Sequence, residues 1–158
     1  MSEATSSLFE PEFVSRLALM FEERISFNRM LGLRITTLEA HVATGRIAMR
    51  PELIGHFTHQ RMHGGVISAT LDAMGGLAVM AAIGASHMED SIDARLARFG
   101  KLGTIDLRVD YLRPATGASF TAVASVQRLG SRVASTRMEF FDAQGKLLST
   151  GAAAYMIA

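Results

Sequence analysis

The second half of the chain alternates between apolar and polar residues in four short runs, which is the period of a β-strand. The runs cover residues 104–112, 119–129, 133–142 and 146–157. The short segments between them carry Gly, Pro, Asp and Ser, which tight turns favour. Alternating strands joined by short turns pair antiparallel, so we expect these four runs to form one sheet.

The first third of the chain changes its period at Gly32. Apolar residues recur at helical spacing over residues 11–30, which predicts an amphipathic helix. Residues 33–49 then alternate like a strand, with a change of parity across Thr44 and Gly45. We interpret this change as a bulge or tight bend within one long, curled strand.

The middle of the chain is nearly apolar on every side. Residues 66–85 are rich in Ala and Gly and predict a helix that is buried all round. The stretch could cross a bilayer, which takes about 20 residues. Asp72 within it would cost roughly 2.5–3.5 kcal/mol in a membrane, so we expect a core helix and no membrane partner. Residues 51–62 are expected to form a short, irregular segment, and residues 86–101 a charged connector.

These elements predict an α+β fold in which a curled antiparallel sheet of about five or six strands wraps one long central helix. We divide the chain into an N-terminal helical extension, residues 1–30, and a main domain, residues 31–158. Such a sheet leaves an open edge and an exposed outer face, which proteins commonly cover by self-association. We therefore expect a homodimer, doubled to a homotetramer by packing of the sheet faces.

The composition excludes several classes of protein. The 158 residues carry 16 Lys and Arg against 15 Asp and Glu, and a net charge of +1 gives no general attraction for nucleic acid. The absence of Cys excludes thiol nucleophiles, iron–sulfur clusters and Cys-based zinc sites. No nucleotide motif such as GxGxxG is present, and we expect neither a metal nor a cofactor. The acidic N-terminus is unlike a targeting peptide, so we expect a cytoplasmic protein.

His63, Gly64 and Gly65 stand directly before the apolar helix. Two glycines there let backbone N–H groups approach a ligand closely, and the positive end of the helix dipole points to the same place. A developing oxyanion would be stabilised at that point. Asp72 is the one carboxylate in the apolar stretch. We favour a functional role for it over an internal cap or an ion pair across an interface, because lone buried acids are costly.

At this point the sequence resembles the hotdog-fold thioesterases, in particular the phenylacetic-acid-degradation type of acyl-CoA thioesterase within the 4-hydroxybenzoyl-CoA thioesterase superfamily. The resemblance covers about residues 30–157 and implies a hotdog domain over residues 31–158. It rests on the HGG motif with an acid nine residues after His63, on the strand TIDLRVDYLRPA at residues 104–115, and on the closing strands with an Asp-x-x-Gly turn.

The resemblance implies a role for each matching residue. Asp72 would act as general base on water, or as nucleophile, against the thioester carbonyl, and the N–H of Gly65 would polarise the carbonyl oxygen. His63 would support the loop or the thioester, and Thr104 would help to position the water. The site would form across a dimer interface. One base and one oxyanion donor suffice, because a thioester needs less activation than an amide.

The sequence departs from the family pattern six residues before His63. The family carries Asn or Gln there, whereas this chain has Phe57, so the residue that orients the water stays open. The same loop resembles the GHF motif of hydroxyacyl thioester dehydratases, in which His56 would be catalytic. Thr70 stands where that reaction needs an acid, so dehydration is the minor alternative. We assign His56 to a polar loop at the mouth of the substrate pocket.

Coenzyme A carries three phosphates, so a site for it needs cations. Between residues 91 and 137 the chain has eight basic residues against three acids. Arg113 follows one strand, and Arg128 and Arg132 flank Gly130 in a turn, so we expect these turns to converge on the phosphates. A solvated basic rim is the alternative for any single arginine.

We therefore predict an acyl-CoA thioesterase for a medium-chain, long-chain or aryl acyl-CoA. The alternative is an acyl-CoA-binding or sensing protein of the same fold without catalysis. Asp72 favours the enzyme, because a binding module needs no carboxylate beside the thioester. The N-terminal helix carries several Met and Phe residues, among them Phe21 and Phe27. These residues either belong to the core or line an acyl tunnel.

Overall fold

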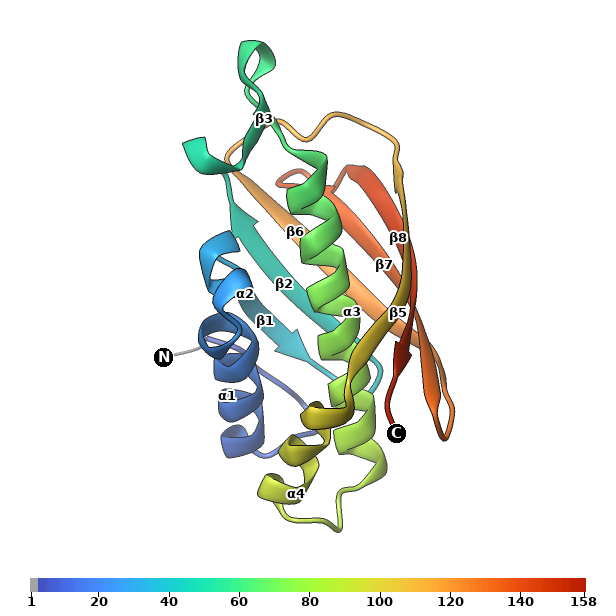
Figure 1. Cartoon of the computed structure of the whole chain (residues 1–158). Helices are drawn as coiled ribbons and strands as arrows, with labels where there is room; N and C mark the ends of the chain where they lie inside the picture. The colour runs from blue at the N-terminus through green and yellow to red at the C-terminus, as the bar shows by residue number, and fades with distance from the viewer. Residues whose placement is uncertain (1–2) are drawn as a thin grey trace.

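The computed structural model describes residues 3–158 and is built around one sheet and one helix (Figure 1). Six strands lie in the order β1-β2-β6-β7-β8-β5, and every neighbouring pair is antiparallel. The helix α3, Gly64–Ser86, packs against the inner face of this sheet. The predicted α+β fold is confirmed. The strands are β1 Arg34–Leu38, β2 Val42–Ala48, β5 Gly103–Tyr111, β6 Ser119–Leu129, β7 Val133–Asp142 and β8 Leu147–Met156.

The four C-terminal strands begin and end within one residue of the predicted runs. The turn between β7 and β8 shows how particular residues of the sequence specify a turn. Oδ1 of Asp142 accepts hydrogen bonds from the N–H groups of Gln144 and Lys146, both at 2.9 Å. Gly145 has a φ of 78°, which glycine adopts without strain. Asp and Gly at these two positions therefore fix the turn between β7 and β8.

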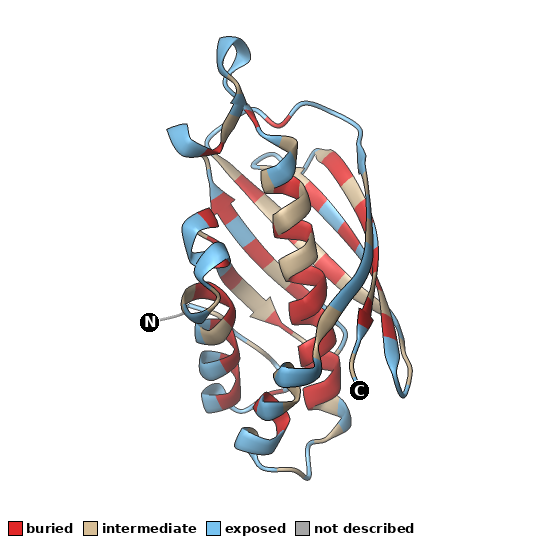
Figure 2. Ribbon diagram, viewed as in Figure 1, coloured by how far each residue is buried: buried red, intermediate tan, exposed pale blue. Residues whose placement is uncertain are grey.

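The central helix α3 is buried over most of its length (Figure 2). Every residue from Met74 to Gly84 is buried, as the apolar sequence predicts. The helix is long and apolar enough to cross a membrane, but 72% of its most apolar window is buried within this fold. Its N-terminal half keeps one partly open side, on which Ala69, Asp72 and Ala73 are half-buried.

Residues 33–49 form two strands, which corrects the single long strand expected from the sequence. β1 and β2 are a hairpin that turns at residues 39–41, a segment without Gly, Pro, Asn or Asp. The bulge lies in β1, between Ile35 and Thr37, rather than at Thr44. Gly45 is explained by close packing rather than by a bend. A Cβ there would lie 2.8 Å from the sulfur of Met74, so β2 passes too close to α3 for a side chain.

The predicted N-terminal helix is divided into three segments. α1, Pro11–Leu19, runs into the π-helical turn η1, Met20–Arg24, and α2, Ser26–Leu31, follows after a break. The break lies at Ile25, whose backbone is extended. Gly32 ends α2 in a left-handed conformation with a φ of 75°, as its place in the sequence predicts. The chain then enters β1 at the edge of the sheet (Figure 1).

The connector between α3 and β5 contains helix, which the sequence analysis did not predict. It holds α4, Ile92–Ala97, and the 3-10 turn η4, Arg98–Lys101. Arg95 in α4 is only 1% exposed. Its guanidinium pairs with Glu10 at 2.6 Å and lies 4.5 Å from the ring centroid of Phe13. These contacts fasten α4 to the N-terminal helix α1.

A small hairpin projects beyond the N-terminal end of α3 (Figure 1). It consists of β3, Ile54–His56, and β4, Arg61–Met62, with the 3-10 turn η3, Phe57–His59, at its tip. The turn η2, Pro51–Leu53, precedes it. Phe57 is 82% exposed, so the tip stands clear of the core.

Candidate active site

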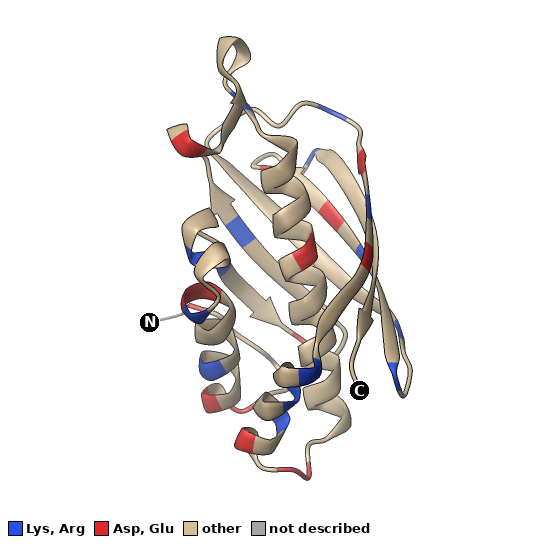
Figure 3. Cartoon of the chain, in the orientation of Figure 1, with Lys and Arg blue, Asp and Glu red and all other residues tan. Residues whose placement is uncertain are grey.

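Asp72 is the one charged residue of α3 (Figure 3). Thr104, at the start of β5, donates its hydroxyl to Oδ1 of Asp72 at 2.9 Å. A bulge between Thr104 and Asp106 permits this contact, because it turns Thr104 to the face opposite to Asp106. The regular alternation expected from the sequence is therefore interrupted here, and Ile105 is 56% exposed. The structure brings together the predicted base and the predicted positioning residue.

Tyr155 of β8 completes the cluster around Asp72, and the sequence patterns did not single it out. Its side chain is buried, and its hydroxyl lies 2.8 Å from the carbonyl oxygen of Asp72 and 3.3 Å from Oδ1. Burial, together with the nearby charge of Asp72, raises the pKa of Tyr155 well above its ordinary value, so the phenol keeps its proton. The available signal was the pair Gly75 and Gly76 within a helix, which indicates that another group approaches closely.

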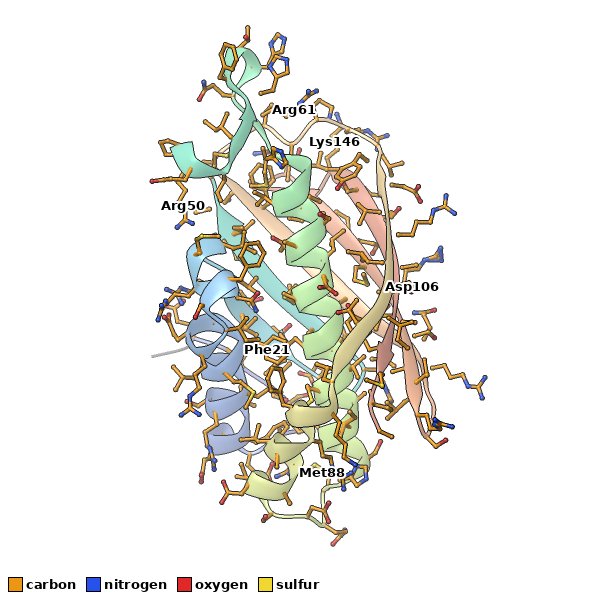
Figure 4. All side chains as sticks on the ribbon, viewed as in Figure 1. Phe21, Arg50, Arg61, Met88, Asp106 and Lys146 are labelled. Atoms are coloured by element: carbon orange, nitrogen blue, oxygen red, sulfur yellow. The ribbon has the colours of Figure 1, made fainter. Side chains whose placement is uncertain are left out.

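An apolar pocket of about 260 Å³ opens beside Asp72. Its polar lining groups are Asn28, Asp72, Thr104 and Tyr155. Phe21 and Phe99 meet edge-to-face within the lining, with ring centroids 5.7 Å apart. Figure 4 shows Phe21 between the N-terminal helices and α3. The pocket is therefore bounded by segments from both ends of the domain, and its apolar lining consists of Phe21, Ile25, Phe27, Ala69, Ala73, Gly76, Phe99, Leu102 and Gly103.

The sequence predicts an open anion site at the N-terminal end of α3, but the structure shows that this end is capped. The N–H of Gly65 donates to Nδ1 of His63 at 2.8 Å, so the His63 side chain caps the helix. His63, Gly65 and Val66 line a second pocket of about 390 Å³, and Phe27 lines this pocket as well as the one beside Asp72. A ligand that uses the Gly65 N–H must displace the His63 ring.

The two parts of the site lie at opposite ends of β5. Gly65 and Asp72 occupy the same side of α3, seven residues or about 10 Å apart along the helix axis. At the start of β5, Thr104 binds Asp72. At its end, the hydroxyl of Tyr111 donates to the carbonyl oxygen of Gly64 at 2.8 Å. β5 thus runs alongside the open half of α3, in the opposite direction.

The three arginines expected to bind phosphate do not converge within one chain. Arg113 lies just past β5, where its guanidinium donates to the carbonyl oxygen of Leu147 at 2.9 Å. Arg128 and Arg132 flank the turn at Gly130, at the opposite end of the sheet. All three side chains are exposed. The expectation of convergence is therefore wrong for a single chain, because the antiparallel register separates the two turns by the length of a strand.

Two other cations from the basic segment serve the fold. Arg95 is buried against Glu10, and Arg98 pairs with Asp90 at 3.0 Å. The Arg95 guanidinium is therefore closed to a phosphate, whereas the Arg98 side chain is 40% exposed and already paired with an acid. The basic surplus counted from the sequence is therefore smaller at the surface than its composition indicates.

His56 lies in the projecting hairpin and does not line the pocket beside Asp72. Its ring stacks on that of His59, with centroids 4.7 Å apart. Its Nδ1 is buried and has no hydrogen-bond partner among residues 3–158. Within the same described range, no three His, Asp or Glu side chains gather in a way that could hold a metal ion.

Comparisons of the sequence and of the structure with known proteins agree on one family. Residues 59–149 match the Thioesterase superfamily. The medium/long-chain acyl-CoA thioesterase YigI of Escherichia coli (strain K12) is 36% identical over 138 residues, 87% of this chain and 89% of that protein. A crystal structure of a Shewanella oneidensis protein related to the thioesterase superfamily has a TM-score of 0.87 at 41% identity, covering 93% of this chain and 96% of that one. A solved structure from Syntrophus aciditrophicus has a TM-score of 0.79 at 32% identity, covering 91% and 95%. The resemblance to the hotdog thioesterases is confirmed, and the chain belongs to the thioesterase superfamily, a family of thioester hydrolases.

Proposed function

We propose that the protein hydrolyses the thioester of a medium- or long-chain acyl-CoA to the free acid and coenzyme A. The observation that carries the proposal is the arrangement of the Asp72 carboxylate. Oδ1 is held by Thr104, whereas Oδ2 receives no hydrogen bond from residues 3–158. A base that is held at one oxygen and open at the other, beside an apolar pocket, suits the activation of water against an acyl thioester. The name of the relative YigI supports the substrate class.

In the proposed reaction Asp72 takes a proton from a water molecule while the water oxygen attacks the thioester carbonyl carbon. The C–S bond breaks as the tetrahedral intermediate collapses, and the proton passes from Asp72 to the departing thiolate. Direct attack by Asp72 would instead form an acyl anhydride on its carboxylate. Turnover in ¹⁸O-water tests for the second route, because label in Asp72 requires an anhydride that water opens at the Asp72 carboxyl carbon.

The geometry favours a composite site as part of this proposal. Gly65, the proposed oxyanion donor, lies about 10 Å from Asp72 along α3, too far for both to contact one carbonyl group in the same chain. β5 is an edge strand of the sheet, and most of its side chains are exposed. Antiparallel pairing of two β5 strands about a twofold axis would place Gly65 of the partner subunit beside Asp72. We therefore propose a homodimer, paired into a homotetramer through the sheet faces.

The same pairing accounts for the separated arginines. Arg113 lies past the end of β5, and the turn with Arg128, Gly130 and Arg132 lies at the end of the sheet where β5 begins. In an antiparallel dimer, Arg113 of the partner subunit approaches this turn. We propose that these groups contact the coenzyme A phosphates, with His56 at the pocket mouth, because guanidinium groups suit bidentate phosphate binding.

A thiol-release assay over a ladder of acyl-CoA chain lengths tests the activity. We expect Asp72→Asn to lower the rate by at least about 100-fold while the far-UV circular dichroism stays unchanged, since general acid–base catalysis contributes roughly 10²–10⁴-fold. Glu89→Gln, at an exposed position between α3 and α4, is the matched control and should retain full activity. If Asp72→Asn keeps more than a third of the activity, the assignment fails. Binding of acyl-CoA without thiol release would identify a binding protein instead.

Mixing two inactive variants tests the composite site. Gly65→Pro removes the N–H in the first helical turn, where proline is tolerated. Gly65→Ala retains the N–H and is the control, and its Cβ would lie 2.9 Å from Nδ1 of His63, so the His63 ring must shift to admit it. After Gly65→Pro and Asp72→Asn subunits are unfolded and refolded together, about half of the dimers are mixed and one of their two sites is intact, so about a quarter of the activity returns. No recovery would place Gly65 and Asp72 in the same site of one chain.

A further inference from the structure

Tyr155 is a buried titratable residue that the proposed reaction does not use. Its hydroxyl carries one proton and faces two acceptors of the same residue, the carbonyl oxygen of Asp72 at 2.8 Å and Oδ1 at 3.3 Å. The phenol can therefore donate to the backbone or to the carboxylate by rotation about a single C–O bond. Both acceptors belong to the proposed base.

The helix is built to admit this hydroxyl. A Cβ on Gly75 would overlap the hydroxyl oxygen of Tyr155, and a Cβ on Gly76 would lie 3.7 Å from the ring. Glycine within a helix costs about 1 kcal/mol relative to alanine. Gly75 is therefore a costly choice for α3, and its position is explained by the approach of Tyr155 to Asp72.

Two hydroxyl groups converge on the same carboxylate oxygen. Thr104 donates to Oδ1 from β5, and Tyr155, its paired residue on the neighbouring strand β8, also reaches Oδ1. Oδ2 receives no hydrogen bond from the described part of the chain. Holding Oδ1 at two points fixes the plane of the carboxylate and directs Oδ2 toward the open side.

We propose that Tyr155 is a positioning residue, which together with Thr104 holds Oδ1 of Asp72 so that Oδ2 faces the attacking water. The catalytic part of this inference rests on the proposed function. While Asp72 is ionised, Tyr155 donates to Oδ1 and stabilises the negative charge. When Asp72 has taken a proton from water, the hydroxyl returns to the Asp72 carbonyl oxygen. The raised pKa of Tyr155 keeps its proton in place through both steps.

Tyr155→Phe removes the hydroxyl and keeps the ring, so it is the direct kinetic test. We expect kcat to fall about tenfold, with KM for acyl-CoA within about twofold, because a hydrogen bond to a charged group affects the reacting centre and not the bound acyl chain.

Tyr111→Phe is a comparison for stability, since it also removes a 2.8 Å hydroxyl bond to a carbonyl oxygen of α3. Tyr111 is 53% exposed whereas Tyr155 is buried, so Tyr111→Phe should lower Tm less than Tyr155→Phe. An unchanged kcat in Tyr155→Phe, with the Tm lowered, would show a purely structural role.

A spectroscopic test covers the case in which Tyr155→Phe does not fold. The chain has two tyrosines, so fluorotyrosine incorporated into the Tyr111→Phe variant labels Tyr155 alone. The ¹⁹F chemical shift of Tyr155 should change when Asp72→Asn is added, because the negative charge that faces the hydroxyl is lost. A signal that does not respond to Asp72 would overturn the proposal. This readout does not need turnover, so it can succeed even if the wild-type protein fails to hydrolyse acyl-CoA, and the two failures remain distinct.

Discussion

Thr104 donates its hydroxyl to Oδ1 of Asp72 at 2.9 Å, which links an edge strand to the central helix at the proposed base. Thr104→Val keeps the shape of the side chain and removes the donor. We expect kcat to fall about tenfold or more, because hydrogen bonds to charged groups contribute about 1.5–3 kcal/mol. Thr104→Ser retains the donor and should keep most of the activity. Equal rates for the Val and Ser variants in the thiol-release assay would contradict the positioning role.

Two adjacent glycines of α3 should respond oppositely to alanine. A Cβ on Gly76 meets Leu102 at 3.4 Å and Phe21 at 3.8 Å, which are ordinary contacts, whereas a Cβ on Gly75 overlaps the Tyr155 hydroxyl. We expect Gly76→Ala to raise Tm, since alanine favours a helix by about 1 kcal/mol over glycine. Gly75→Ala should lower Tm. Calorimetry of both variants measures this contrast, and a higher Tm for Gly75→Ala would contradict the described packing.

Gly76 also lines the pocket, so the same substitution tests the acyl site. The added methyl group fills space next to Phe21. The optimum of the chain-length ladder should therefore move to shorter acyl groups in Gly76→Ala. An unchanged optimum would place the acyl chain elsewhere.

The sheet could be predicted from the sequence because its strands alternate cleanly and end at turn residues. The hairpin between β1 and β2 could not, because its turn at residues 39–41 lacks the residues that usually mark one. The parity change at Gly45 predicts a bend, whereas the structure explains this glycine by the close approach of Met74 from α3. The break at Ile25 has no Gly or Pro either. Tertiary packing determines each of these features, and a local sequence pattern carries no information about that packing.

The sequence predicts those residues of the candidate site whose side chains are unusual for their surroundings. Asp72 stood out as an acid in an apolar stretch, and the family pattern indicated Thr104. Tyr155 did not stand out, since it follows a run of alanines in a strand and meets Asp72 across 83 residues of chain. The bulge that turns Thr104 inward was not visible in the alternation either, because a bulge adds one residue without changing composition.

The ion pair between Glu10 and Arg95 should make stability depend on pH. The Arg95 guanidinium, which donates to the Glu10 carboxylate, lowers the pKa of Glu10 below its ordinary value. The pair therefore stabilises the fold above the ordinary glutamic acid pKa of about 4.3, and this contribution is lost as the pH falls through the lowered value. Glu10→Gln should lower Tm at pH 7, and its difference from wild type should shrink in acid.

Thermal unfolding from pH 7 down to pH 3 measures that dependence. Glu12→Gln is a suitable comparison, since Glu12 is exposed and pairs within α1 itself. A difference between Glu10→Gln and wild type that stays constant with pH would mean that the carboxylate charge does not contribute.

Arg132 tests the proposed recognition of coenzyme A by charge. We expect Arg132→Ala to raise KM for acyl-CoA by about threefold to tenfold, because its exposed guanidinium makes a partly screened contact. KM and kcat for an acyl-pantetheine analogue, which lacks the nucleotide phosphates, should hardly change. Higher ionic strength should weaken binding of acyl-CoA more than binding of the analogue. If the two substrates are equally sensitive to salt and Arg132→Ala does not change KM, the turn at Arg132 is a solvated surface that does not bind coenzyme A.

The edge-to-face pair of Phe21 and Phe99 has a consequence for how substrate length enters the kinetics. Phe99 lies in η4, a few residues before Thr104, so the chain that closes the acyl pocket continues directly into the strand that holds Asp72. In the proposed reaction, an acyl chain packed against both rings would hold this segment in one position. Binding energy from the remote tail would then order the reacting centre. Substrates too short to reach the rings should consequently be slower in kcat as well as weaker in binding.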